Sequence, residues 1–123
     1  AAAAYDIGRR CVVVFGGEAA GRSLWRRPAA DRPRVMTEEA DRQLVSMLRG
    51  VVQLGSGRAA AVPGRSVAGK TGTTSDSRDA WFAGFVDGLV VVVWIGADDN
   101  TPIPGAVTGG TIPAQVFRQV VGN

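Results

Sequence analysis

Residues 67–74 read VAGKTGTT and contain the only lysine of the chain, Lys70. Small and β-branched residues of this kind are typical of a strand. Successive side chains of a strand point to opposite faces, so Thr71 and Thr73 should share one face while Lys70 lies on the other. Two hydroxyls separated by Gly72, which allows close backbone approach, form a candidate ledge for a carboxylate. The same residues are also compatible with an ordinary threonine-rich edge strand that carries an exposed lysine. An edge strand would in addition offer free N–H and C=O groups to an extended peptide.

Two more strands are expected after this one. Residues 78–86 are rich in aromatic side chains, and residues 89–95 read LVVVVWI. Asp87-Gly88 between them is a two-residue hairpin signal, because both residues tolerate the positive φ angles of such a turn. The sequence therefore predicts a three-stranded antiparallel meander. Because residues 89–95 do not alternate in polarity, we expect helices to cover both faces of the sheet.

The meander is flanked by two predicted helices. Thr37 is a good N-cap residue, acidic residues follow it, and apolar residues then recur with helical spacing until Gly55. Near the end of the chain, Thr111 is a second candidate cap, with Pro113 in the first helical turn. Residues 55–64 are mostly small and are expected to form a loop that leads to the first strand of the meander.

The first third of the chain carries weaker signals. Residues 11–15 and 22–26 are plausible short strands, and residues 27–34 read as a proline-containing linker. Several arginines lie here, but few aromatic residues accompany them, so a solvated surface is favoured over a nucleic-acid site.

Composition limits the chemistry that the chain can perform. Its 123 residues are enough for one domain or a large part of one, and 46% apolar with 20% charged residues is typical of a globular protein. The sequence has no histidine, which excludes Ser-His-Asp and Cys-His catalysis and HExxH zinc sites. Its single cysteine, Cys11, excludes an internal disulfide. No metal site and no cofactor is expected, and the longest apolar run is too short to cross a bilayer.

Residues 64–71, GRSVAGKT, match the phosphate-binding pattern GxxxxGK[ST] letter for letter. That pattern requires a buried strand before Gly64 and a helix that begins at Lys70. Neither is predicted here, because Pro63 interrupts the preceding residues and the following ones are poor helix formers. A P-loop NTPase therefore remains an alternative that a structure can test.

Together, four stretches resemble the end of the transpeptidase domain of penicillin-binding proteins, most closely of the class A, bifunctional type. They are VAGKTGTT at 67–74, RDAWFAGF at 78–85, VWIGADD at 93–99 and TGG at 108–110. The resemblance is good over residues 36–121 and loose before them. It implies an α+β fold like that of serine β-lactamases, an antiparallel sheet flanked by helices, and an incomplete domain. Residues 1–35 would then be loosely matched strands and linker, and residues 36–123 the C-terminal half of the domain.

The resemblance also implies an active-site serine that this chain does not contain. Enzymes of this family carry S-x-x-K, S-x-N and K-T-G motifs, the serine of the first being the nucleophile. With Lys70 as the only lysine, S-x-x-K would need serine at position 67, where Val67 stands. We therefore expect a fragment whose nucleophile, and any N-terminal membrane anchor, lie on sequence outside this chain.

For the intact parent, the resemblance implies acyl transfer on the D-Ala-D-Ala end of peptidoglycan stem peptides, and acylation by β-lactams, at the outer face of the bacterial inner membrane. Lys70 would supply positive potential, and the hydroxyls of Thr71 and Thr73 would hold the ligand carboxylate. The Thr73 N–H would be an oxyanion-hole donor, and Gly72 would keep the strand face open. A non-catalytic wall-associated module is a further alternative.

Other conspicuous residues are given structural roles. Asp79 is expected to make a local hydrogen bond, and Trp81 and Phe82 are expected in the core. Asp98 and Asp99 are expected to cap a loop and not to bind a metal ion, because no further carboxylates follow at ligand spacing.

Overall fold

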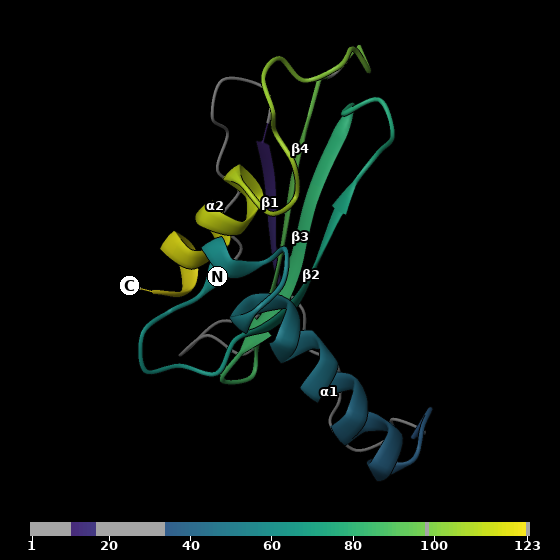
Figure 1. The fold of residues 1–123 in the computed structure, drawn as a ribbon, viewed down its shortest axis with the longest axis vertical. Coiled ribbons are helices and arrows are strands. Elements are labelled where there is room, and N and C mark those ends of the chain that lie inside the picture. Colours follow the sequence, from purple (N-terminus) through teal and green to yellow (C-terminus); the bar gives the residue numbers. More distant parts are fainter. Residues whose placement is uncertain (1–10, 17–33, 98, 123) are drawn as a thin grey trace.

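The structure, a computed structural model, describes residues 11–16, 34–97 and 99–122, the first of these ranges by its backbone alone. The fold is a four-stranded antiparallel sheet with two helices (Figure 1). The strands lie in the order β1-β4-β3-β2 across the sheet. The elements in chain order are β1 (Cys11–Gly16), α1 (Glu38–Gln53), the 3₁₀ turn η1 (Arg58–Ala60), β2 (Ala68–Thr73), β3 (Asp79–Val86), β4 (Leu89–Gly96) and α2 (Ile112–Val121).

The predicted meander is confirmed. β2 pairs with β3, and β3 pairs with β4, both antiparallel. Asp87 and Gly88 have φ angles of 50° and 80°, as the hairpin signal predicted. Lys70 lies within β2 and starts no helix, so the geometry that a P-loop needs is not formed. The P-loop alternative is wrong because the residues after the lysine continue an extended strand.

β1 adds a fourth strand by pairing with β4, Cys11 lying opposite Ile95. This confirms the strand expected at residues 11–15. The strand expected at residues 22–26 and most of the linker at 27–34 lie outside the described residues. The loop after α1 contains the short turn η1, which the sequence analysis did not predict.

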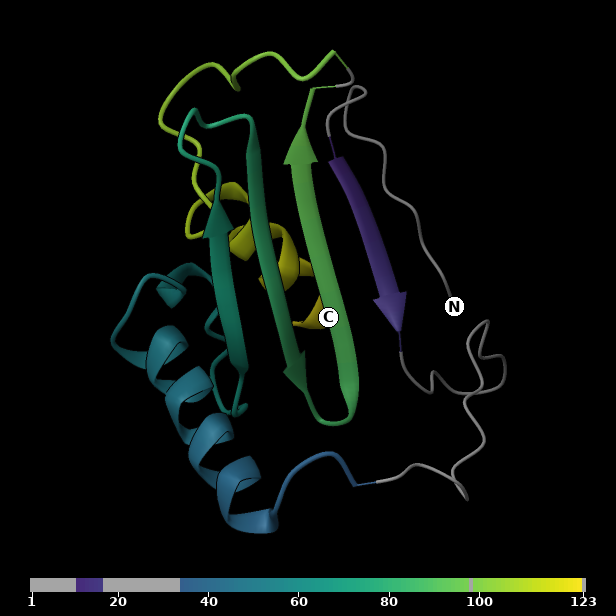
Figure 2. The ribbon, with the colours of Figure 1, turned by 90° about the vertical axis from the view of Figure 1, so that its right-hand side faces the viewer.

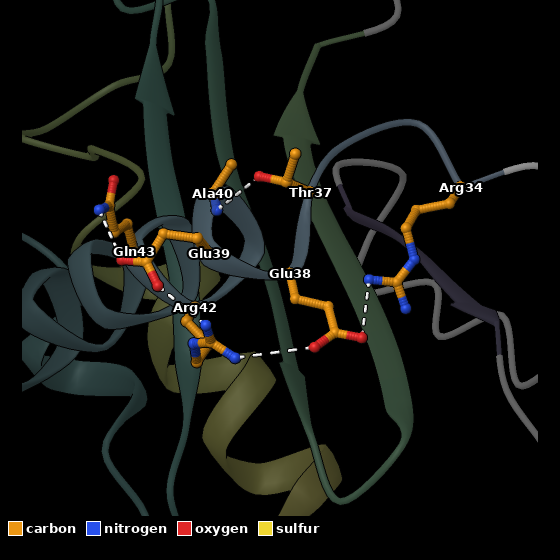
Figure 3. Close-up of polar contacts among 7 residues, drawn as sticks. All are labelled: Arg34, Thr37, Glu38, Glu39, Ala40, Arg42 and Gln43. Carbon is orange, nitrogen blue, oxygen red and sulfur yellow. Dashed lines mark hydrogen bonds and ion pairs between the residues drawn. The ribbon is translucent and has the colours of Figure 1, made fainter.

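α1 begins where its sequence signals indicated. The Thr37 side chain accepts a hydrogen bond of 3.2 Å from the Ala40 N–H, which satisfies one free amide of the first turn (Figure 3). Glu38 pairs with Arg34 at 3.1 Å, and Glu39 accepts from Arg42 at 2.8 Å. The Arg42 guanidinium, and secondarily the amide of Gln43, lower the pKa of Glu39 below its ordinary value.

α1 is exposed over most of its length and lies beside the edge strand β2, whereas α2 lies across one face of the sheet (Figures 1 and 2). Phe82 of β3 and Phe117 of α2 are both fully buried, with ring centroids 4.9 Å apart in an edge-to-face arrangement. Around these rings stand three glycines, Gly57, Gly69 and Gly84. A Cβ atom at any of them would come within 3.1 Å of the Phe82 ring.

The expectation that helices cover both faces of the sheet is wrong for the described part of the chain. Val91 and Val93 point toward α2 and are fully buried, but Val90, on the other face, is 49% exposed. Trp81 shares that open face and is 43% exposed, so its assignment to the core is also wrong. The physical reason is that α1 packs along the edge strand and not on the second face.

The start of α2 also differs in detail from the prediction. Thr111 is the N-cap residue, but its hydroxyl makes no capping hydrogen bond to the helix. It accepts from the Thr108 N–H at 2.9 Å and donates to the Thr108 carbonyl at 2.8 Å. Thr111 therefore closes a tight turn over residues 108–111 in place of capping the helix.

Replacing Gly84 by alanine should destabilise the fold. Its Cβ would lie 2.8 Å from Phe82, 2.9 Å from Phe117 and 3.0 Å from the Ala68 carbonyl oxygen, so the core would be overpacked. We expect a loss of about 1–3 kcal/mol in the free energy of unfolding, measured in urea by tryptophan fluorescence. The matched control is Gly50→Ala in α1, where nothing lies within 4 Å. That change should stabilise the helix by about 0.5–1 kcal/mol, and equal effects of the two variants would contradict the packing described.

Candidate active site

The end of β2 carries all four residues that the sequence analysis selected, Lys70, Thr71, Gly72 and Thr73. β2 is the last strand of the sheet order, so one of its edges carries no strand in the described part of the chain. The Thr74 N–H donates to the Asp79 carbonyl of β3 at 3.0 Å. Because successive amides of a strand point to opposite sides, the Thr73 N–H points away from β3, toward that free edge.

The Lys70 ammonium reaches the same edge. Its side chain is exposed, and Nζ donates a 2.7 Å hydrogen bond to the Thr71 carbonyl oxygen. The N–H and C=O of one residue in an antiparallel strand point to the same side, so the Thr71 carbonyl also faces away from β3. The free edge therefore combines a positive charge with an outward-pointing amide, a combination suited to an anionic or carbonyl-containing ligand.

The side chains of Thr71 and Thr73 lie on one face of β2, as the alternation of side chains along a strand predicted. The side chain of Lys70 leaves the strand on the opposite face. Neither hydroxyl is isolated. Thr71 Oγ1 is 2.7 Å from Ser56 Oγ, and Thr73 Oγ1 accepts a 3.0 Å hydrogen bond from the Gly109 N–H. Since an amide can only donate, the Thr73 hydroxyl keeps its own proton available for an acceptor.

The loop before α2 lies very close to the backbone of β2. A Cβ atom on Gly109 would be 2.1 Å from the Trp81 carbonyl oxygen and 2.6 Å from that of Gly72. By contrast, a Cβ atom on Gly72 would be 3.4 Å from Trp81 Cβ, an ordinary contact. In the described structure the close backbone approach therefore requires glycine at position 109 more than at position 72.

Ser56 and Gly109 are the two residues that reasoning from the sequence missed. The pair Gly109-Gly110 indicates a turn, but nothing in the spacing shows that the turn docks on β2. Ser56 lies in the glycine-rich segment 55–57, which takes part in the family resemblance, but nothing in that segment shows that the serine hydroxyl reaches β2. Each is separated in sequence from its threonine, by 15 residues for Ser56 and by 36 for Gly109.

The neighbouring conspicuous residues have structural partners. Asp79 accepts a 2.8 Å hydrogen bond from the Trp94 indole, which confirms its expected local role. Phe82 is in the core as predicted. Asp99 accepts hydrogen bonds from the amide and hydroxyl of Thr101, at 3.1 and 2.8 Å, as a loop cap does. Its neighbour Asp98 lies outside the described residues.

Comparison with known proteins identifies the family. The family described as "Penicillin binding protein transpeptidase domain" matches residues 2–122. Penicillin-binding protein 1A of Rickettsia typhi is 39% identical over 90 residues, which cover 73% of this chain and 12% of that protein. The chain belongs to the penicillin-binding protein transpeptidase family, and it spans only a small part of the length of this relative.

Solved structures agree with this assignment. The transpeptidase domain of the FtsI4 D,D-transpeptidase from Legionella pneumophila matches with a TM-score of 0.58 and 34% identity, over 69% of this chain and 35% of that one. The PonA1 protein of Mycobacterium tuberculosis in complex with penicillin V matches with a TM-score of 0.53 and 26% identity, over 60% of this chain and 22% of that one. The resemblance expected from the KTGT, RDAWF and VWIG stretches is confirmed.

Replacing Gly109 by alanine should displace the loop from β2, because the new methyl group would meet backbone atoms that cannot rotate away. We expect a loss of about 1–3 kcal/mol in the free energy of unfolding. Thr73→Ala is the control, since it removes the hydrogen-bond acceptor without adding an atom and should cost only about 1 kcal/mol. Urea unfolding measures both, and a Gly109→Ala variant as stable as wild type would show that the contact is not needed.

Proposed function

We propose that this chain is the C-terminal part of a serine-type peptidoglycan D,D-transpeptidase domain and forms one wall of its active site. The observation that carries the proposal is the end of β2, where a lysine ammonium, an outward amide and two threonine hydroxyls meet at a free sheet edge in a chain of this family. The substrate would be the D-Ala-D-Ala end of a stem peptide. β-Lactams would react at the same place, and the penicillin V complex of PonA1 supports this ligand class.

The reaction would be acyl transfer through an acyl-serine intermediate. A serine on the remainder of the parent would attack the carbonyl of the penultimate D-Ala, the terminal D-Ala would leave, and an amine of a second stem peptide would take the acyl group. Within this chain, Lys70 would raise the electrostatic potential near the reacting groups. The Thr73 N–H, which points to the free edge, would donate to the oxyanion that develops on the attacked carbonyl, a contribution of about 3–4 kcal/mol for such donors.

The hydroxyls of Thr71 and Thr73 would bind the terminal carboxylate of the peptide or of the β-lactam. A carboxylate only accepts hydrogen bonds, so each threonine must offer its own proton to it. Thr73 is supported in this role by the Gly109 N–H, which occupies an acceptor position of the hydroxyl and leaves the proton free. Gly72 would keep the strand between the two threonines accessible.

The parent would act at the outer face of the bacterial inner membrane, since its peptidoglycan substrate lies there. Residues 36–123 would form the C-terminal half of the domain and residues 1–35 its more divergent strands and linker. No helix among the described residues is long and apolar enough to span a membrane.

Removing either hydroxyl should slow acylation of the intact parent by a β-lactam. Thr71→Val and Thr73→Val each delete one donor and preserve the shape of the strand. A hydrogen bond to a charged group is worth about 1.5–3 kcal/mol, so the second-order acylation rate constant should fall by roughly ten- to a hundredfold. Lys70→Ala should cost at least as much, because it removes the only lysine of this wall. Thermal melting is the control for folding, and unchanged rates in both threonine variants would contradict the proposed carboxylate site.

The chain alone should form no covalent adduct with a β-lactam, because it contains no S-x-x-K serine. Intact-mass spectrometry after incubation with benzylpenicillin measures this directly. The parent protein under the same conditions is the positive control and should gain one acyl group. A stoichiometric adduct on the isolated chain would mean that the nucleophile lies within these residues.

A further inference from the structure

We propose that Ser56 is a positioning residue for the carboxylate site, acting through the Thr71 hydroxyl. Ser56 Oγ lies 2.7 Å from Thr71 Oγ1, a hydrogen bond in which either oxygen can be the donor. The inference rests on the proposed function, since it concerns how Thr71 meets a ligand carboxylate.

The direction of this hydrogen bond follows from counting protons. A hydroxyl has one proton to donate and can accept two hydrogen bonds. When Thr71 donates its proton to Ser56, it has none left for a carboxylate, which can only accept. When Ser56 donates to Thr71, the Thr71 proton is free for the ligand. Carboxylate binding at Thr71 therefore selects the arrangement in which Ser56 is the donor, and the chain of two hydroxyls strengthens the second bond cooperatively.

The neighbouring threonine shows the same arrangement with a different donor. Thr73 Oγ1 accepts from the Gly109 N–H at 3.0 Å, and an amide cannot reverse that direction. Both threonine hydroxyls are thus hydrogen-bonded to a loop outside β2. At Thr73 the donor is fixed by the backbone, whereas at Thr71 it depends on one side chain, that of Ser56.

The backbone around Ser56 is held firmly enough for this role. The next residue, Gly57, donates its N–H to the Val51 carbonyl at 2.9 Å, and a Cβ atom on it would lie 3.1 Å from the Phe82 ring. On the other side, a Cβ atom on Gly110 would come within 2.2 Å of the Ser56 carbonyl oxygen, so the two loops are in close contact. Ser56 is therefore fixed against Thr71 by the core on one side and by the loop before α2 on the other.

The test uses the full-length protein that carries this segment, with benzylpenicillin and its methyl ester as the two probes. The ester has the same reactive ring but no carboxylate charge. Ser56→Ala should lower the second-order acylation rate constant for benzylpenicillin by about three- to tenfold, as expected for the loss of one supporting hydrogen bond. The ester rate should stay within twofold of wild type. Ser56→Thr, which keeps a hydroxyl, should retain most of the benzylpenicillin rate.

A double variant provides a second readout that does not need the ester. If Ser56 acts through Thr71, Ser56→Ala should have no effect beyond twofold in a Thr71→Val background. Ser66→Ala, a serine replacement at an exposed position outside the site, is the matched control and should leave all rates unchanged.

Three results would overturn the inference while leaving the proposed function intact. One is an unchanged benzylpenicillin rate in Ser56→Ala. The second is an additional loss from Ser56→Ala in the Thr71→Val background, and the third is an equal loss with both probes. Either of the last two would mean that the serine only stabilises the fold. If the wild-type full-length protein is not acylated by benzylpenicillin at all, the proposed function itself fails, and that outcome is distinct from all three.

Discussion

The packing of the Phe82 ring is the constraint on which the rest of the structure depends. The ring is fully buried on β3, lies 4.9 Å from that of Phe117 on α2, and is approached by Gly57, Gly69 and Gly84. These contacts join the turn after α1, two strands and the C-terminal helix at one point. A side chain at Gly69 or Gly84 would force these segments to shift, because its Cβ atom would come closer than 3.0 Å to the Phe82 ring.

That packing also builds the candidate site. Gly57 against the ring holds Ser56 beside Thr71, and α2 against the ring holds the loop that brings Gly109 to Thr73. Two loops thus support the hydroxyls on one face of β2, while no strand among the described residues pairs with the outer edge of β2. In the proposed function, the site would therefore depend on these two loops as well as on the four residues at the end of β2.

The comparison of KTGT with the phosphate-binding pattern shows why a motif needs its structural context. The letters GRSVAGKT fit a P-loop, but a phosphate cradle needs the amide groups of a helix that begins at the lysine. In this protein Lys70 stands in a strand, so successive amides point to opposite sides and cannot converge on one anion. A strand edge instead favours a linear ligand, such as the end of a peptide, that runs along it.

The sequence alone determined the local features: the strands around residues 67–95, the Asp87-Gly88 hairpin, the start of α1 at Thr37 and the separation of Lys70 from the two threonines. Each follows from side-chain periodicity or from the φ angles that a residue tolerates, which adjacent residues decide. It did not determine that the described helices leave one sheet face uncovered, that Thr111 closes a turn, or that Ser56 and Gly109 support the threonines. The two supporting hydrogen bonds join residues 15 and 36 positions apart in the sequence, and only the packing of distant segments around a shared core brings such residues together.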